Sequence, residues 1–290
     1  MGAKYLIRKR ALGDVLWIEP IISTLAESNI KLVVFSKYNQ LFENYPYKNV
    51  VFKDKLNFFE KILIRISKLP LLKNKVINLD DSYEKEPLQH FLHAYQTVAG
   101  LPLIEAYPKL YLSDNEKEMF RQQKIDGGYA VLHIENNLLK NYRRVFGISW
   151  ETIVSFLKSR GKKVYILGDG GVKVNGAKNL TTTLREMIAM IYNADIFIGI
   201  DSGPSHIAAA LSIPSVIFFG AVNPKFRHFE KLFKGIWLQK PCEFSGCFHT
   251  FKVSEKGTCR IVGDIGTPPC CSFATKELEE SIDLVIKKYI

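Results

Sequence analysis

The sequence contains no apolar run long enough to cross a membrane. Its longest such run, Ile207 to Val222, is interrupted by Ser212, Pro214 and Ser215, and it falls short of the ~18 residues that a transmembrane helix needs. The opening stretch MGAKYLIRKRALGD lacks the apolar core of a secretory signal peptide. We therefore expect a protein of the cytoplasm.

Sequence motifs of nucleic-acid binding are also missing, since we find no RNA-recognition, helix-turn-helix or zinc-finger pattern. The chain is nevertheless basic, with a formal net charge of +11 and an isoelectric point near 9.3. Such a balance favours anionic partners, for example a phosphorylated ligand or an acidic lipid surface. A basic surface that only keeps the protein in solution explains it equally well. No nucleic-acid partner is predicted.

Cysteine is absent before residue 242. The five cysteines follow in the pattern C-x4-C-x11-C-x10-C-C, which lacks the C-x2-C pairs of a zinc ribbon. Because a cytoplasmic chain rarely relies on disulfides, metal binding and free thiols are the main alternatives, and disulfides remain a third.

The first part of the chain has the pattern of a parallel α/β domain. KYLIRK predicts a strand, RALGD a loop, Val15 to Glu27 an amphipathic helix, and IKLVVFS a second strand. A basic segment between Leu56 and Ile77 has apolar residues at helical spacing; VINLD resembles a further strand, and PLQHFLHAYQTVAGL a further helix. A β–loop–α–β opening of this kind begins a doubly wound parallel sheet.

A second αβ pattern follows a Pro-containing and then strongly charged connection. The runs YAVLHI, KVYILGD, DIFIGI and PSVIFFG predict strands that alternate with helical stretches. We expect an α/β fold of two Rossmann-like domains, residues 1–122 and 123–290, facing each other across a cleft. Lys276 to Ile290 predicts a last amphipathic helix, with packing back on the N-terminal domain as one alternative.

The stretch IGIDSGPSHIAAALSIPSVIFFG places polar residues between a buried strand and a buried helix. Asp201, Ser202 and Gly203 follow the strand, Pro204 suits the first turn of the helix, and His206 lies one turn into it. Free N–H groups at a helix N-terminus attract phosphate, so the pattern favours a diphosphate site. The alternative is that Asp201 or Ser202 only caps the helix.

Two segments carry a family resemblance. DSGPSHIAAALSIPSVIFFG resembles one signature of the heptosyltransferase family (glycosyltransferase family 9), and YLIRKRALGDVLWIEPIISTL resembles the other. The resemblance implies the GT-B arrangement of two Rossmann-like domains. It also implies inverting transfer of a sugar from a nucleotide donor, usually ADP-heptose, as in lipopolysaccharide biosynthesis. The first domain would bind the acceptor and the second the nucleotide sugar.

By the same resemblance, Asp14 is the candidate base that takes the proton of the acceptor hydroxyl. A carboxylate at a helix N-terminus that faces a cleft suits this role, and Gly13 would supply the tight turn before it. The alternative is that Asp14 only caps the helix that starts at Val15.

The departing diphosphate needs cations, and LLKNYRRVFGISW offers three: Lys140, Arg143 and Arg144. Counting back from Trp150, Arg143 stands where the family has Lys, while Val145 and Phe146 replace its Trp-Pro. The loop LGDGGVKVNGA lacks the ribose-binding Glu of well-studied members, and only Asp169 is acidic there. Leu184 and Met187 are candidates for the nucleobase pocket, with core packing as the alternative.

Neither catalytic metal nor cofactor is required in this scheme, because helix N-termini and basic side chains supply positive charge. Heptosyltransferases that act on autotransporter proteins hold iron through four C-terminal cysteines. By resemblance Cys242, Cys247, Cys259 and Cys271 are candidates for a structural iron or zinc site.

The predicted helix from Phe58 to Lys75 carries Lys61, Arg65 and further lysines beside its apolar residues. That composition suits peripheral contact with an anionic membrane, and so a lipid-linked saccharide acceptor; a charged solvent face over core residues is the alternative. A free saccharide or a protein acceptor is also open. Two other functions are kept: a sugar-nucleotide epimerase, and a non-catalytic nucleotide-binding relative.

Overall fold

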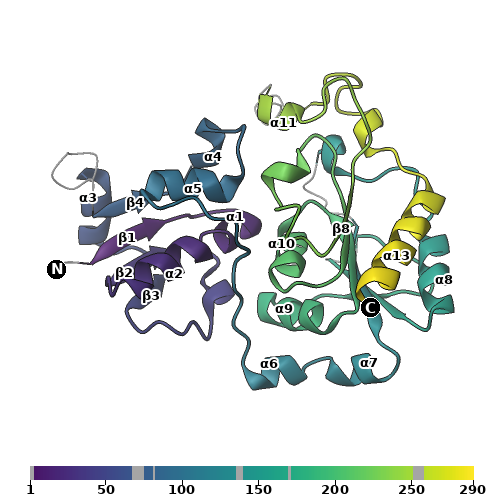
Figure 1. The fold of residues 1–290 in the computed structure, drawn as a ribbon, viewed down its shortest axis with the longest axis horizontal. Helices are drawn as coiled ribbons and strands as arrows, with labels where there is room; N and C mark the ends of the chain where they lie inside the picture. Colours follow the sequence, from purple (N-terminus) through teal and green to yellow (C-terminus); the bar gives the residue numbers. More distant parts are fainter. Residues whose placement is uncertain (1–2, 67–74, 81, 135–139, 169–170, 251–257) are drawn as a thin grey trace. The chain divides into compact units, whose positions relative to one another are not determined.

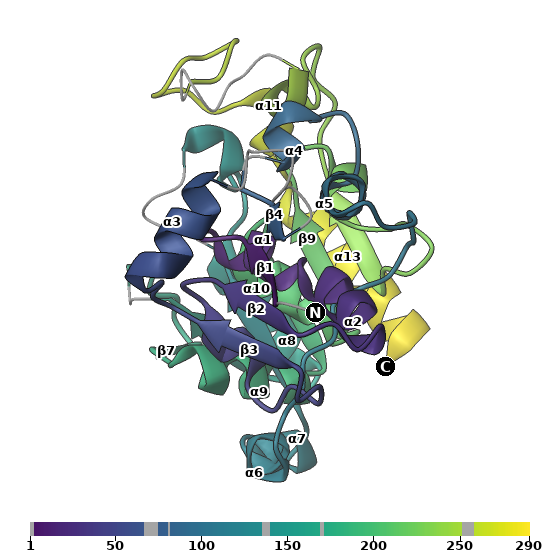
Figure 2. The same ribbon diagram turned by 90° about the vertical axis from the view of Figure 1, so that its left-hand side faces the viewer.

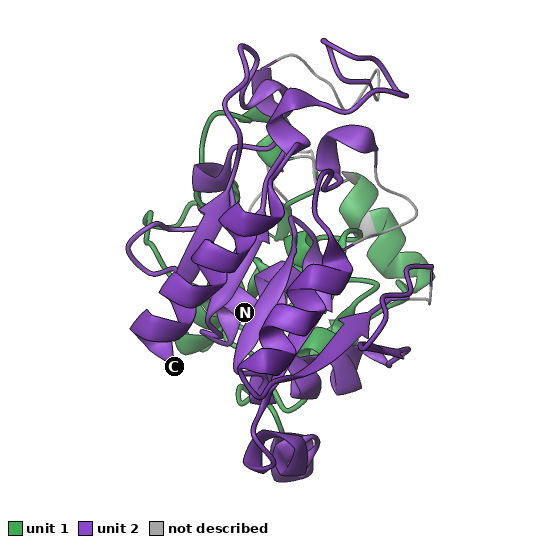
Figure 3. Ribbon diagram, turned by 90° about the vertical axis from the view of Figure 1, so that its right-hand side faces the viewer, with its two compact units in different colours: residues 1–112 green, residues 113–290 purple. Residues whose placement is uncertain are grey.

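The chain forms two compact units, Met1–Leu112 (unit 1) and Ser113–Ile290 (unit 2), coloured separately in Figure 3. The structure, a computed structural model, describes residues 3–66, 75–80, 82–134, 140–168, 171–250 and 258–290. The units divide earlier in the chain than the predicted boundary of 122/123. The reason is that the charged segment after Leu112 is folded onto unit 2: the Arg185 guanidinium donates to both carboxylate oxygens of Glu116, at 2.6 and 2.8 Å.

Unit 1 contains a four-stranded parallel sheet in the order β3-β2-β1-β4. Its strands are β1 (Lys4–Ile7), β2 (Leu32–Phe35), β3 (Val50–Lys53) and β4 (Val76–Asn78). The chain runs outward from β1 to β3 and then returns to the other side of β1. The strand order therefore reverses between β1 and β4, and such a switch point is where open α/β sheets bind ligands.

The helices of unit 1 differ from the prediction at one point (Figure 1). They are α1 (Leu12–Leu16), α2 (Glu19–Glu27), α3 (Phe58–Ile66), α4 (Ser82–Lys85) and α5 (Phe91–Ala99), with a 3-10 turn η1 (Asn39–Phe42). The single helix predicted from Val15 to Glu27 is two helices, because α1 ends at Leu16 and Pro20 lies in the first turn of α2. Proline fits a first helical turn but not a helix interior. Trp17 is fully buried against Phe91.

Unit 2 contains a six-stranded parallel sheet in the order β10-β9-β8-β5-β6-β7. Its strands are β5 (Tyr129–His133), β6 (Lys163–Leu167), β7 (Lys178–Leu180), β8 (Ile196–Ile200), β9 (Ser215–Phe218) and β10 (Gly235–Leu238). The four apolar runs predicted as strands are β5, β6, β8 and β9. The switch point lies between β5 and β8, where His133 pairs in register with Gly199.

The helices of unit 2 are α6 (Asp114–Glu118), α7 (Arg121–Ile125), α8 (Trp150–Ser159), α9 (Leu184–Asn193), α10 (Gly203–Ala210), α11 (Cys247–Thr250) and α13 (Thr275–Tyr289), with 3-10 turns η3 (Asn141–Arg143), η4 (Pro224–Phe226) and η5 (Pro269–Cys271). Among these helices, α8, α10 and α13 pack against the sheet of unit 2. The last predicted helix is α13, and its packing on the N-terminal domain stays a prediction. Leu278, Ile282 and Val285 of α13 belong to the core of unit 2, beside α8 and β9.

None of the helices in the described ranges is long and apolar enough to span a bilayer.

Candidate functional site

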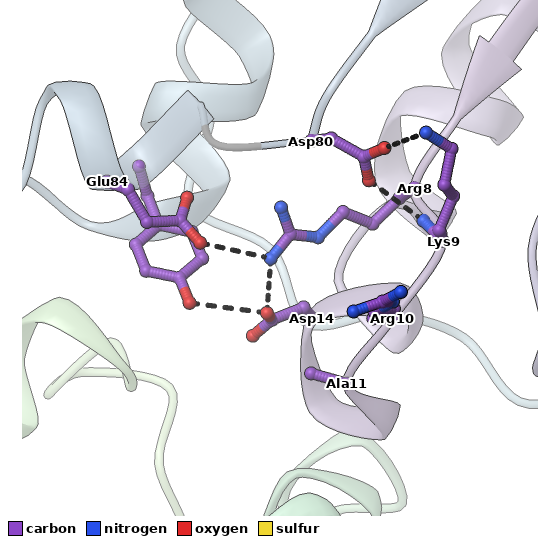
Figure 4. Close-up of a pocket in the computed structure, with 8 residues that line it drawn as sticks. Arg8, Lys9, Arg10, Ala11, Asp14, Asp80 and Glu84 are labelled. Atoms are coloured by element: carbon purple, nitrogen blue, oxygen red, sulfur yellow. Dashed lines mark hydrogen bonds and ion pairs between the residues drawn. The ribbon is translucent and has the colours of Figure 1, made fainter. Parts of the chain in front are cut away.

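A cavity of 440 Å³ opens at the switch point of unit 1. Two loops line it, since the loops after β1 and β4 leave the same edge of the sheet side by side (Figure 4). The first contributes Arg8, Ala11 and Asp14, and the second contributes Asp80, Tyr83 and Glu84. Carboxylates, guanidinium groups and a phenol therefore meet at the place where the topology favours ligand binding.

Asp14 is held in this cavity by two side chains. The Arg8 guanidinium donates through Nη2 to Asp14 Oδ2, and the Tyr83 hydroxyl donates to the same oxygen at 3.3 Å. Arg8 is itself fixed, because Nη1 donates to the Leu79 carbonyl at 3.0 Å and Nη2 lies 3.5 Å from Glu84 Oε1. Asp14 is the third residue of α1, and the residue that precedes this helix is Ala11; the role of Asp14 as a base stays a prediction.

The backbone before Asp14 is unusual. Ala11 has a φ of 63°, in a region that residues with a Cβ rarely adopt. Outliers of this kind persist where the surrounding structure enforces them, and they concentrate at functional sites. The turn brings Asp14 back toward Arg8, six residues earlier in the chain.

The charged groups in the cavity change one another's pKa. Burial works against the charge of Arg8, but Tyr95 and Asp14 close by raise the pKa of its guanidinium, which therefore stays protonated. Burial raises the pKa of the Glu84 carboxyl, and the Arg8 charge opposes that rise. A buried, permanently charged guanidinium beside Asp14 is an arrangement that fixes the orientation of a carboxylate.

The second site lies at the switch point of unit 2. The Ser202 hydroxyl lies 3.0 Å from His133 Nδ1, at the end of β5, and donates to the Ile200 carbonyl at 3.2 Å. Gly203 begins α10 directly afterwards. Burial lowers the pKa of His133 to about 4, so this imidazole is neutral near pH 7.

Asp201, Arg143 and His206 are brought together beside Ser202. Arg143 Nη2 donates to the Asp201 carbonyl at 2.7 Å and to Asp201 Oδ2 at 3.0 Å, and His206 Nε2 lies 3.7 Å from Asp201 Oδ1. Burial alone would raise the pKa of the Asp201 carboxyl, but the charges of Arg143 and Arg227 lower it. The carboxylate therefore stays ionised and holds a cluster of cationic and imidazole groups at the N-terminus of α10.

The remaining predicted site residues are not gathered at this centre. Lys140 is exposed and precedes η3, whereas Arg144 lines a separate cavity of 180 Å³ with Phe146 and Trp150. Of the three candidate cations, only Arg143 is paired with Asp201 in the contacts described above. Leu184 and Met187 are half-buried on α9. Asp169 lies outside the described residues, and Gly13 is buried within α1.

The five cysteines are free thiols in unit 2. Burial, and then the charges of Cys270, Cys259 and Cys242, raise the pKa of the Cys247 thiol to about 11; Cys270 Sγ and Cys271 Sγ are 3.8 Å apart. The sulfur atoms are thus close enough to influence one another, and thiolates suit zinc or iron. Among the residues that the structure describes, however, no three Cys, His, Asp or Glu side chains already form a metal-binding group.

Sequence reasoning missed several residues of both sites. In unit 1 these are Arg8, Tyr83 and Glu84; in unit 2 they are His133, Arg227 and His228. Arg8 and His133 each lie near the carboxyl end of a predicted strand, and polar residues at that position indicate a ligand site in a parallel sheet. His228 stacks on His206 with ring centroids 5.1 Å apart, and burial, followed by the His206 charge, lowers its pKa; nothing in the local sequence around His228 indicates that contact.

The part of unit 2 that contains the second site is similar to a known protein family. Residues 178–250, which run from β7 to α11 and include Asp201 and His206, match the family model for glycosyltransferase family 9 (heptosyltransferase). The predicted resemblance to glycosyltransferase family 9 is confirmed. The chain is 48% identical over 44 residues to lipopolysaccharide heptosyltransferase 3 of Escherichia coli, a stretch that covers 15% of this chain and 13% of that protein. The match to this curated relative thus spans far less than two thirds of its length.

Solved structures agree with the fold. An iron-containing dodecameric glycosyltransferase, TibC, from enterotoxigenic E. coli H10407 is 17% identical with a TM-score of 0.73 over 100% of this chain and 78% of that chain. The ADP-heptose lipopolysaccharide heptosyltransferase II of E. coli is 15% identical with a TM-score of 0.67, over 99% of each chain. The predicted fold class, α/β with two parallel sheets as in GT-B proteins of this family, is therefore confirmed.

Proposed function

We propose that this protein is a glycosyltransferase that moves a heptose from ADP-heptose to an acceptor hydroxyl, with inversion at the anomeric carbon. The observation that carries the proposal is the family 9 match over residues 178–250, because that segment contains Asp201, Ser202 and His206 at the switch point of a parallel sheet. A structure of the dodecameric relative holds ADP-D-beta-D-heptose, which supports this donor.

The diphosphate of the donor would bind at the N-terminus of α10. Backbone N–H groups there and the positive end of the helix dipole favour an anion, and the Ser202 hydroxyl would add a donor by turning from the Ile200 carbonyl to the phosphate. Arg143, whose side chain keeps 29% of its surface exposed beside Asp201, would supply the charge that stabilises the leaving diphosphate. Lys140 and Arg144 remain alternative contacts.

The acceptor would bind in the cavity of unit 1 near Asp14. In the reaction, a carboxylate oxygen of Asp14 takes the proton of the acceptor hydroxyl as that oxygen bonds to the anomeric carbon. The bond from the anomeric carbon to the diphosphate oxygen breaks, and ADP leaves with the electron pair. Arg8 and Tyr83 would keep the carboxylate aimed at the hydroxyl. This chemistry needs no metal.

We further propose a saccharide, free or lipid-linked, as the acceptor, with a protein acceptor as the alternative. We also propose a structural iron or zinc held by Cys242, Cys247, Cys259 and Cys271. Such an ion would fix the loops around α11 and η5 and would take no part in transfer. Metal analysis of the purified protein tests this, and retention of ADP binding after chelation would separate it from the donor site.

The decisive experiment compares the native chain with the variant Asp14→Asn. We expect ADP release in the presence of ADP-heptose and acceptor to fall about 10²- to 10⁴-fold, while calorimetric binding of ADP stays unchanged. The matched control is Asp80→Asn, an acid of the same cavity that is paired with Lys9, which should lose much less activity. Equal turnover of Asp14→Asn and native protein would remove Asp14 from the mechanism; sugar isomerisation without acceptor would favour an epimerase.

A further inference from the structure

Helix α3 of unit 1 exposes a group of apolar residues that the proposed function does not use. Phe58 and Phe59 are 71% and 80% exposed, and Ile62 is 41% exposed. The two phenyl rings contact each other edge to face, with centroids 5.9 Å apart. The sequence interpretation in which these residues cover the core is therefore wrong for Phe59 and Ile62.

The arrangement of residues around α3 explains the exposure. At 100° per residue, Phe58, Ile62 and Arg65 share one side of the helix, with Phe59 and Lys61 on its flanks. The opposite side is held to the unit: Glu60 is buried and forms an ion pair with Lys53 of β3, while Ile64 is half-buried. The helix is thus anchored through a charged pair and turns its aromatic residues outward.

The charge on the exposed side of α3 is of one sign. Its exposed charged residues in the described part are Lys61 and Arg65; just before the helix, exposed Asp54 and Lys55 offset each other. Figures 1 and 2 show that α3 lies apart from α2 and α5 in unit 1. Aromatic side chains flanked by cations on one face of a surface helix are typical of helices that lie in the membrane interface.

We propose that α3 is a membrane-docking element that inserts Phe58, Phe59 and Ile62 among the headgroups of an anionic lipid surface. Lys61 and Arg65 would then face the lipid phosphates. A second copy of this chain is a poorer occupant, because the exposed charges of α3 would be Lys61 and Arg65 in both copies, while its acid Glu60 is buried in the ion pair with Lys53. This inference does not depend on the proposed transferase activity, since lipid binding is measured without donor or acceptor.

The test is co-sedimentation of the full-length protein with vesicles. We expect binding to phosphatidylcholine vesicles that contain phosphatidylglycerol and little binding to phosphatidylcholine alone. The double variant Phe58→Ser/Phe59→Ser should lose most of the bound fraction. Lys61→Glu/Arg65→Glu should weaken the partition coefficient by at least about 25-fold, since each cation near such a surface contributes about fivefold.

Matched controls lie on unit 2. Ile125→Ser replaces an apolar side chain that is 67% exposed, and Lys124→Glu reverses an exposed cation on the same helix; both should bind like the native protein. If all variants bind alike, the general basic charge is responsible and α3 is not the docking element. Equal binding to both kinds of vesicle, binding to neither, or self-association that sedimentation velocity finds only when Phe58 and Phe59 are present, would each overturn the proposal.

Discussion

Each unit pairs an arginine with an aspartate at the switch point of its sheet, but the two pairs are reversed in exposure. In unit 1 the Arg8 side chain is only 6% exposed, and Asp14, at 15%, borders the cavity. In unit 2 the Asp201 side chain is 5% exposed, and Arg143, at 29%, reaches outward. The accessible member is an acid in one unit and a cation in the other. This difference matches a base for a hydroxyl in unit 1 and an anion site in unit 2.

The largest effect is expected when the buried acid is removed. Asp201→Asn leaves Arg143 and Arg227 without their carboxylate, and breaking a buried ion pair costs about 3–5 kcal/mol of the free energy of unfolding. Asp14→Asn should cost less, about 1–3 kcal/mol, because the Arg8 guanidinium that remains still donates to the Leu79 carbonyl and lies beside the Glu84 carboxylate. Urea denaturation measures both: Trp17 reports on unit 1, and Trp150 and Trp237 report on unit 2.

An exposed pair provides the control for this comparison. Asp283 is 50% exposed and paired with Arg160. The variant Asp283→Asn should lower the free energy of unfolding by less than about 1 kcal/mol. Similar losses for Asp201→Asn and Asp283→Asn would contradict the view that Asp201 organises unit 2.

The second prediction concerns pH and unit 2. The pKa of His133 is lowered to about 4 in the folded protein, whereas an unfolded histidine titrates near 6.5. Below pH ~6.5 the unfolded state binds a proton that the folded state does not. The free energy of unfolding therefore falls as the pH drops from ~6.5 toward ~4, by up to roughly 3 kcal/mol.

The variant His133→Asn keeps a side chain that can hydrogen-bond to the Ser202 hydroxyl and removes the titration. We expect a smaller loss of unit 2 stability over the same pH range, measured by urea denaturation at each pH. An unchanged pH dependence would assign the effect to His228, whose pKa is also lowered.

The order of the strands in the two sheets explains which parts of the fold and of the sites can be predicted from local sequence. The strands with continuous apolar runs, such as β5 and β8, and the polar loop at Asp201 follow from local sequence. Strands β7 and β10 do not, because both lie at sheet edges and their residues are mostly half-buried or exposed. The cluster of Asp14 with Tyr83 arises because β4 pairs with β1, and no local pattern encodes that pairing across the sequence.

The third prediction concerns Arg8 as a positioning residue for Asp14. Arg8→Met removes the donor that orients the Asp14 carboxylate, so we expect kcat to fall about 10- to 100-fold while the KM for the donor stays unchanged. Arg8→Lys keeps the charge but loses the planar set of donors, and it should recover part of the rate. An equal loss in both variants, together with lower stability of unit 1, would indicate a purely structural role.

The fourth prediction concerns the start of unit 2, a segment that the sequence assigned mostly to the first domain. Arg185 holds Glu116 through both carboxylate oxygens; this hydrogen bonding, against the effect of burial, lowers the pKa of Glu116 to about 2. Glu116→Gln should cost about 1–2 kcal/mol of unit 2 stability at pH 7. Because the lowered pKa favours the ionised folded form, the difference in the free energy of unfolding between variant and native protein should shrink as the pH falls from ~4.5 toward ~2.

Hydrogen exchange of residues 114–125 measures the local effect, since α6 would separate from α9 more often without changing unit 1. Faster exchange in unit 1 instead would mean that this segment belongs to the first unit, as the sequence had suggested.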